Sequence, residues 1–234
     1  AFILLLSALC LAACATRPTT NINAFARRSA DNSFELLNRV VDPSALVLAV
    51  VHDRQTTPAS CGAHALASIV NYWLGTSATS GERLFSASPP VDPVHGYSLA
   101  ELLANARDNG LTANAVRLSQ ADLIEELESG RPVLIPIQAP GVYIGARALP
   151  VANVPVIGFA RNIVVNRIAR IAESSGMAMV SHYLIVAGYD QDGFVVVEPV
   201  RGYRTISFER LARYRRPFSD AALVFSASAA SETG

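Results

Sequence analysis

Apolar residues recur at helical spacing in several stretches of the chain. Residues 59–74 bring five apolar side chains to one helix face: Ala65, Leu66, Ile69, Val70 and Trp73. Pro58 and Ser60 mark the start of this helix, which can bury one face and hold its first turn at the surface. Two further helices are predicted at residues 99–107 and 118–128, because a capping serine stands at the start of each and a glycine follows its end.

Beyond residue 130 the pattern changes to short runs of β-branched and other apolar residues, which are typical of strands. Such runs occupy residues 132–137, 182–187 and 193–197, and an earlier one occupies residues 45–52. The sequence Asp-Gln-Asp-Gly at 190–193 predicts a hairpin turn between the last two strands. Helices that come first and antiparallel strands that follow indicate an α+β domain, with N-terminal helices packed on a C-terminal antiparallel β-sheet.

A long insertion, residues 138–181, separates two of these predicted strands. Within it, residues 156–171 place isoleucines and valine on one helical face and arginines elsewhere. Such a helix can lie on anionic lipid or on a partner, or it can cover the core of its own domain. The Gly-Val-Tyr-Ile-Gly run at 141–145 predicts either a flap over a cleft or a plain hairpin.

The first 13 residues are almost wholly apolar, too short to span a bilayer as a helix, and followed by Cys14. This is typical of a secretory signal, and without a basic segment before it we expect the sequence to begin inside that signal. Leu11-Ala-Ala-Cys14 resembles a bacterial lipobox, which implies that residues 1–14 form a signal peptide with Cys10 removed and Cys14 lipidated. An ordinary signal peptide cleaved elsewhere is the alternative.

Composition limits the rest of the chain. Residues 15–32 are polar and predict a flexible tether, and residues 33–234 suit one domain that contains the insertion. The formal net charge is zero and no basic block occurs, so nucleic acid is not an expected partner. No glycine-rich nucleotide motif and no clustered metal ligands occur, so we expect no cofactor and no metal.

The residues after Cys14 bear on location. Ala15 and Thr16 stand where an aspartate would signal inner-membrane retention in a Gram-negative cell. We therefore expect a cell-envelope protein, anchored by lipid on the periplasmic side of the outer membrane. A secretion or envelope protein is an expected partner, beside a peptide or protein substrate.

Cys61 is the leading candidate for a nucleophile. After processing it would be the remaining thiol of the chain, and it begins an apolar helix followed by Gly62. A thiolate is the reactive form of cysteine, and the unpaired N–H groups of a helix N-terminus favour negative charge. An unpaired cysteine in an oxidising compartment is a liability unless its reactivity is used. The alternative is a cysteine that fills the core.

A thiol nucleophile needs a base and a group that orients the base. His182 begins one predicted strand and Glu198 ends its hairpin neighbour, so the two side chains can meet. Gln55 precedes Cys61 by one short loop and can donate a hydrogen bond to an oxyanion. His64, on the same helix as the cysteine, would struggle to reach a thiol at the helix end. The other two histidines, His52 and His95, lie in or beside loops and are expected to lack a positioned carboxylate.

This arrangement resembles the papain-like cysteine peptidases that process bacteriocins, the double-glycine leader peptidases, over roughly residues 52–225. The resemblance implies a papain-like fold, with Cys61 as nucleophile, His182 as general base, Gln55 as oxyanion donor and Glu198 as orienter. The family usually has aspartate before the proline where this chain has Glu198 and Pro199.

Three functions stay open on the sequence. The leading hypothesis is a lipid-anchored, exported cysteine peptidase that cleaves a peptide or leader segment through a Cys-His-Glu triad and an acyl-enzyme. The alternative is a catalytically weak papain-like binding or assembly module of the cell envelope. Another acyl transfer on cell-wall peptides, by an amidase or transpeptidase, would use the same triad.

Overall fold

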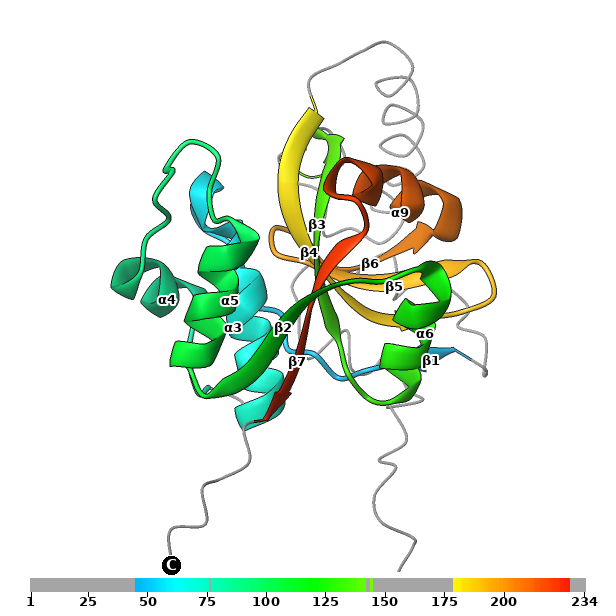
Figure 1. Cartoon of the computed structure of the whole chain (residues 1–234), viewed down its shortest axis with the longest axis horizontal. Coiled ribbons are helices and arrows are strands. Elements are labelled where there is room, and N and C mark those ends of the chain that lie inside the picture. The colour runs from blue at the N-terminus through cyan, green and yellow to red at the C-terminus, as the bar shows by residue number, and fades with distance from the viewer. Residues whose placement is uncertain (1–44, 76, 142–143, 145–178, 228–234) are drawn as a thin grey trace, which may run out of the picture.

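A seven-stranded antiparallel sheet forms the centre of the molecule (Figure 1). The computed structural model describes residues 45–75, 77–141, 144 and 179–227 of the chain. The strands run in the order β2-β7-β3-β4-β5-β6, with β1 paired to β4. They are β1 (Leu46–Val47), β2 (Leu111–Arg117), β3 (Val133–Pro140), β4 (Met179–Tyr189), β5 (Gly193–Glu198), β6 (Gly202–Ser207) and β7 (Ala221–Ala227). The predicted α+β class is confirmed.

The cysteine helix is the central helix of the fold. A 3₁₀ turn, η1 (Pro58–Ser60), leads into α3 (Cys61–Leu74), as predicted. The expectation that the helix holds its first turn at the surface was wrong, and more than the one expected face is covered, because every residue from Cys61 to Asn71 is buried. α3 contacts α4 and α5 as well as strands β3, β4 and β7, so it has no solvent face in its first three turns.

The two capped helices were predicted correctly, except that the second begins at Gln120 and not at residue 118. α5 (Leu99–Asp108) begins with a capping box, in which Ser98 accepts from the backbone of Glu101 and the Glu101 side chain accepts from Ser98. α6 (Gln120–Glu128) is capped in the same way by Ser119. Both helices end at a glycine with positive φ, which a residue without a Cβ adopts at low cost.

The hairpin of β4 and β5 was also predicted correctly. Asp190 closes its turn by accepting from the backbone N–H groups of Asp192 and Gly193. The strands before and after the insertion are longer than predicted, since β3 and β4 pair from Val133 and Val186 out to Pro140 and Met179. Both predicted limits of the insertion, 138 and 181, therefore lie inside paired strands.

Five elements had no clear pattern in the sequence: α4 (Gly81–Ala87), β2, β6, α9 (Phe208–Arg215) and β7. A second 3₁₀ turn, η2 (Arg216–Phe218), follows α9. The sequence suggested that the helices come first and the strands follow. The structure differs, because strands and helices alternate along the chain. The predicted strand at 45–52 contains only the two residues of β1, because β4 pairs with that segment only at Leu46 and Val47.

The helices lie on both sides of the sheet. Figure 1 shows α3, α4 and α5 to the left of the strands, and α6 and α9 in the right half of the picture, where they overlap β1, β5 and β6. None of the described helices is long and apolar enough to cross a bilayer. The predicted signal peptide with Cys14, the tether and the amphipathic helix at 156–171 lie outside the described residues, as does most of the predicted flap at 141–145.

Candidate active site

Cys61 opens α3 at the point where the helix meets the sheet. It is the one free cysteine among the described residues, and 6% of its surface is exposed. The chain enters the helix through η1, where Ser60 donates to the carbonyl of Thr57 instead of capping the backbone of α3. No side chain of the described residues caps the first turn of α3, and the backbone N–H groups of a helix N-terminus favour a negative charge.

His182 lies on β4 and is almost fully buried. Its Nε2 lies 2.6 Å from Oε1 of Glu198, which leaves Nδ1 as the ring nitrogen available to Cys61. Burial lowers the pKa of His182, but hydrogen bonds with Cys61 and Glu198 outweigh burial and raise this pKa to about 10. The imidazole is therefore held as a cation between a thiol and a carboxylate.

Glu198 ends β5 and has no exposed surface. Burial raises the pKa of its carboxyl, but the hydrogen bond from His182 and the one from the backbone of Val200 outweigh this, so that the pKa is lowered. The pairing of Ile185 with Val197 puts Glu198 beside Leu184 and on the diagonal from His182. The two side chains thus share one face of the sheet and meet across adjacent strands.

Gln55 is close to this group through its backbone. Its N–H donates to the carbonyl of Pro199, the residue after Glu198, at 2.8 Å. Its side-chain Nε2 donates to the carbonyl of Thr57 at 2.6 Å. The amide is therefore near the cysteine helix, with one of its two N–H groups directed to the η1 turn.

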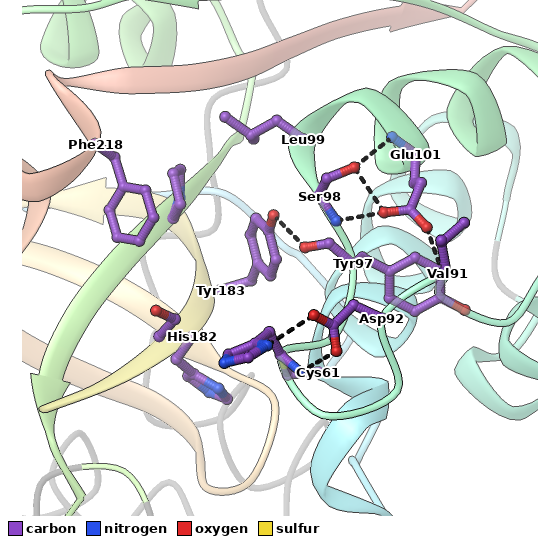
Figure 2. Close-up of a pocket in the computed structure, with 14 residues that line it drawn as sticks. Cys61, Val91, Asp92, Tyr97, Ser98, Leu99, Glu101, His182, Tyr183 and Phe218 are labelled. Atoms are coloured by element: carbon purple, nitrogen blue, oxygen red, sulfur yellow. Dashed lines mark hydrogen bonds and ion pairs between the residues drawn. The ribbon is translucent and has the colours of Figure 1, made fainter. Parts of the chain in front are cut away.

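Cys61 and His182 line a cavity of about 630 Å³. Figure 2 shows Asp92 and Tyr97 on the helical side of this cleft and Tyr183 and Phe218 on the sheet side. The Tyr183 hydroxyl donates to the backbone carbonyl of Tyr97 at 2.9 Å, so the two walls touch at one point. The described walls contain carboxylates and histidines but no arginine.

His95 corrects an expectation drawn from the sequence. It was expected to lack a positioned carboxylate, yet its Nδ1 lies 2.7 Å from Oδ2 of Asp92, and both residues line the cleft. Asp92 also accepts from the backbone N–H groups of Val94 and His95. These bonds lower the pKa of Asp92 to about 2. The signal available in the sequence was an Asp-Pro turn three residues before the histidine.

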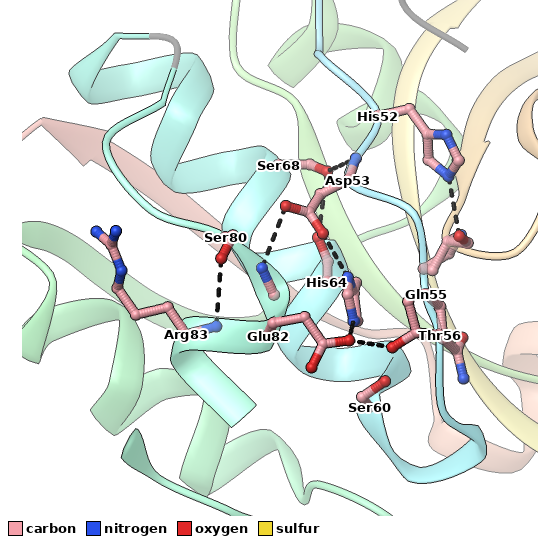
Figure 3. A network of polar contacts seen from close by, with 12 residues as sticks. His52, Asp53, Gln55, Thr56, Ser60, His64, Ser68, Ser80, Glu82 and Arg83 are labelled. Carbon is pink, nitrogen blue, oxygen red and sulfur yellow. Dashed lines mark hydrogen bonds and ion pairs between the residues drawn. The ribbon is translucent and has the colours of Figure 1, made fainter. Parts of the chain in front are cut away.

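His64 and His52 belong to structural contacts. The buried His64 ring pairs through Nδ1 with Asp53, and its Nε2 lies 3.8 Å from Glu82, as Figure 3 shows. Asp53 also accepts from the N–H of Gly81, so the histidine ties α3 to α4 and to the segment before Gln55. Nε2 of His52 lies 2.9 Å from the Pro199 carbonyl, and burial lowers the pKa of this histidine.

No group of three or more His, Cys, Asp or Glu side chains in the described part of the chain is arranged to hold a metal ion. The groups that lie together are instead a thiol, an imidazole and a carboxylate in series. This order can ionise a nucleophile and return its proton to a leaving group.

Comparisons with known proteins agree with this arrangement. The family model described as papain-like cysteine protease AvrRpt2 matches residues 46–159, a stretch that contains Cys61 and Gln55 but ends before His182. No curated protein sequence matches the chain.

Among solved structures, a putative C39-like peptidase from Bacillus anthracis is similar with a TM-score of 0.52 and 16% identity, over 78% of this chain and 97% of that one. The peptidase domain of Streptococcus ComA, a bifunctional ABC transporter of a quorum-sensing pathway, gives 0.49 and 14%, over 74% and 95%. A double glycine motif protease from an AMS/PCAT transporter, solved with its leader peptide, gives 0.47 and 16%, over 79% and 93%.

The fold and the family match define the class of the protein. The fold is the α+β fold of papain-like peptidases, and the site together with the family match over residues 46–159 indicates a cysteine peptidase.

Proposed function

We propose that the chain is a lipid-anchored, exported cysteine peptidase that cleaves a peptide or a leader segment through an acyl-enzyme. The observation that carries the proposal is the position of His182, which is buried between Cys61 and Glu198 and hydrogen-bonded to both. The motif resemblance to double-glycine leader peptidases supports a leader segment as the substrate, and the cavity of about 630 Å³ beside Cys61 offers room for a peptide.

The geometry assigns each side chain a step. The Cys61 thiolate attacks the scissile carbonyl, and the tetrahedral intermediate collapses to a thioester when the C–N bond breaks. His182 gives its proton to the departing amine and then takes one from the water that hydrolyses the thioester. Glu198 keeps the ring oriented and stabilises the imidazolium. The Gln55 amide, whose NH2 group has two donors, donates to the oxyanion.

The proposal is tested by peptide cleavage with the full-length protein in detergent. A library of peptides, some with Gly-Gly at the centre, is incubated with the wild type and the products are identified by mass spectrometry. We expect cleavage by the wild type and none by Cys61→Ala or His182→Gln. His64→Gln is the matched control, since it removes another buried histidine that pairs with a carboxylate. A folded Cys61→Ala protein that still cleaves would overturn the proposal.

The anchor is a separate part of the proposal and is supported by the Leu11–Cys14 pattern. We place the mature protein on the periplasmic side of the outer membrane of a Gram-negative cell. Expression with and without Cys14→Ser, followed by membrane fractionation and intact mass measurement, tests this. We expect a lipid-sized mass increase and an outer-membrane location that are both lost in Cys14→Ser. A wild type of unmodified mass would contradict the anchor without affecting the peptidase assignment.

A further inference from the structure

Three buried ionisable side chains lie on one face of three neighbouring strands. His182 is on β4, Glu198 on β5 and Arg204 on β6. Glu198 pairs with Gly202 and Val196 pairs with Arg204, so Arg204 occupies the diagonal position from Glu198 on the next strand. Glu198 in turn lies on the diagonal from His182. The imidazole, the carboxylate and the guanidinium therefore form one row across the sheet.

The position directly opposite Glu198 holds no side chain. It is Gly202, which has a φ of +77°, a backbone conformation suited to glycine. A long side chain from Arg204 can therefore extend over this position toward the carboxylate. Arg204 is 3% exposed, and a charge that is removed from water to this extent requires compensation from its surroundings.

The hydrogen bonds of Glu198 are unevenly distributed. Oε1 takes the bonds from His182 and from the N–H of Val200. Oε2 is buried and accepts no hydrogen bond from the described residues. A buried carboxylate with one unbonded oxygen tends to take up a proton unless a positive charge is close.

The charged and titratable groups that act on Glu198 come from four elements. They are His182 on β4, Arg204 on β6, the Cys61 thiol of α3 through His182, and His52 in the segment after β1. Burial lowers the pKa of His52, so this ring is neutral at neutral pH. Arg204 is therefore the cation of this set that does not titrate, and its charge lowers the pKa of Glu198.

We propose that Arg204 is a positioning residue of the active site, which keeps Glu198 ionised so that Glu198 can hold His182 for Cys61. The inference rests on the proposed function of the Cys61–His182–Glu198 group. It assigns Arg204 no contact with substrate. The positive charge of Arg204 affects Cys61 indirectly: it acts on the carboxylate of Glu198, which in turn holds the imidazole of His182.

The rate of iodoacetamide labelling of Cys61 as a function of pH tests the inference in the full-length protein. The wild type should label fast, with a rate that falls at low pH as Glu198 takes up a proton. In Arg204→Met we expect this acid limb to move to higher pH by roughly one unit, because a neutralised neighbour makes Glu198 easier to protonate. Arg204→Lys keeps the charge and should restore most of the wild-type profile.

Arg215 supplies the matched control. It is also 3% exposed, and its Nη2 donates to the carbonyls of Leu118 and Asp220, away from the cleft. Arg215→Met should lower the free energy of unfolding and leave the labelling profile in place. A shift of the acid limb in Arg204→Met that Arg215→Met reproduces would overturn the inference, because loss of any buried arginine would then suffice.

Two further outcomes complete the test. If Arg204→Met does not fold, the double variant with Glu198→Gln should fold, because both charges are then removed together; a double variant that is equally unstable overturns the inference. If the wild-type profile does not depend on His182, the proposed function fails. If it does depend on His182 and Arg204→Met leaves it unchanged, the proposed function stands and the role of Arg204 is overturned.

Discussion

Glu198 reaches His182 along a diagonal between neighbouring strands, and the two side chains meet at 2.6 Å. Residues on such a diagonal are about 7–8 Å apart at their backbones, further than a directly opposed pair. The longer glutamate side chain suits this distance.

Shortening this residue will weaken the site. We expect Glu198→Asp to lower kcat by about 10- to 100-fold, because the carboxylate withdraws from Nε2 of His182 and the imidazole loses its fixed orientation. Glu198→Gln, which keeps the length and removes the charge, separates reach from charge. Steady-state kinetics on a cleaved peptide provide the measurement. An Asp variant as active as the wild type would show that the diagonal distance does not matter.

Gln55 distinguishes oxyanion stabilisation from thiol activation. Alkylation of a thiolate forms no oxyanion, whereas peptide hydrolysis does. Gln55→Ala should therefore lower kcat by about 10²- to 10³-fold and leave the rate of iodoacetamide labelling unchanged. His182→Ala should lower both. If Gln55→Ala cleaves peptide at the wild-type rate, the amide is not the donor.

His95 is expected to affect substrate binding. Its side chain is 80% exposed, lines the cleft and is oriented by Asp92, so its Nε2 is available to a bound peptide. We expect His95→Ala to raise KM by roughly 3- to 10-fold, the value of one hydrogen bond, with kcat nearly unchanged. Labelling of Cys61 should not change. A fall in kcat without a change in KM would contradict a binding role.

The free energy of unfolding should depend on pH because His182 and Glu198 both have shifted pKa values in the folded protein. The pKa of His182 is raised from 6.5 to about 10, so its contribution is fully present below pH 6.5 and is lost as the pH rises toward 10. The pKa of Glu198 is lowered, so its contribution is present above pH 4.5 and is lost as the pH falls through the lowered value. Urea unfolding of the wild type and His182→Gln should show a smaller alkaline decline in the variant. Parallel curves would exclude the pair as the cause.

Replacing Gly81 by a larger residue should destabilise the protein. A Cβ at this position would lie 2.2 Å from Nδ1 of His64 and 2.7 Å from its Cα. Gly81→Ala must therefore displace α4 or the His64 ring, at a cost of about 1–3 kcal/mol. Chemical denaturation measures this loss. Gly141→Ala is the control, because its nearest atom would be 3.5 Å away, and equal stability of the two variants would contradict the expected clash.

The parts of the fold that the sequence predicted are those with local signals. Ser98 and Ser119 each cap a helix within four residues, and the Asp190 turn joins two adjacent strands. By contrast, β2 and β7 pair with each other from opposite ends of the domain. Their mixed burial and their alanines, asparagine and threonine give no clear period of two. Their strand identity comes from long-range pairing, which no local window contains.

The same distinction applies to the site. Cys61 and His182 have recognisable local contexts, and the structure brings them together as expected. Arg204 has no such local context. Only the pairing register of β5 with β6 puts it on the diagonal from Glu198, and this register cannot be read from the sequence around Arg204. The direction of the Gln55 side chain was equally inaccessible from the sequence, because it depends on a carbonyl in the η1 turn.

The pairing of Pro140 with Met179 makes the intervening segment a replaceable module. Its two ends leave the sheet side by side, so segments of different length can join them while the strands keep their alignment, provided that the core contact of Ile144 and its bond from Arg201 are kept. His182, three residues beyond Met179 and opposite Ile137, is held by the pairing of β3 with β4. Evolution can therefore vary this region, and an engineer can graft a new one, without rebuilding the catalytic group.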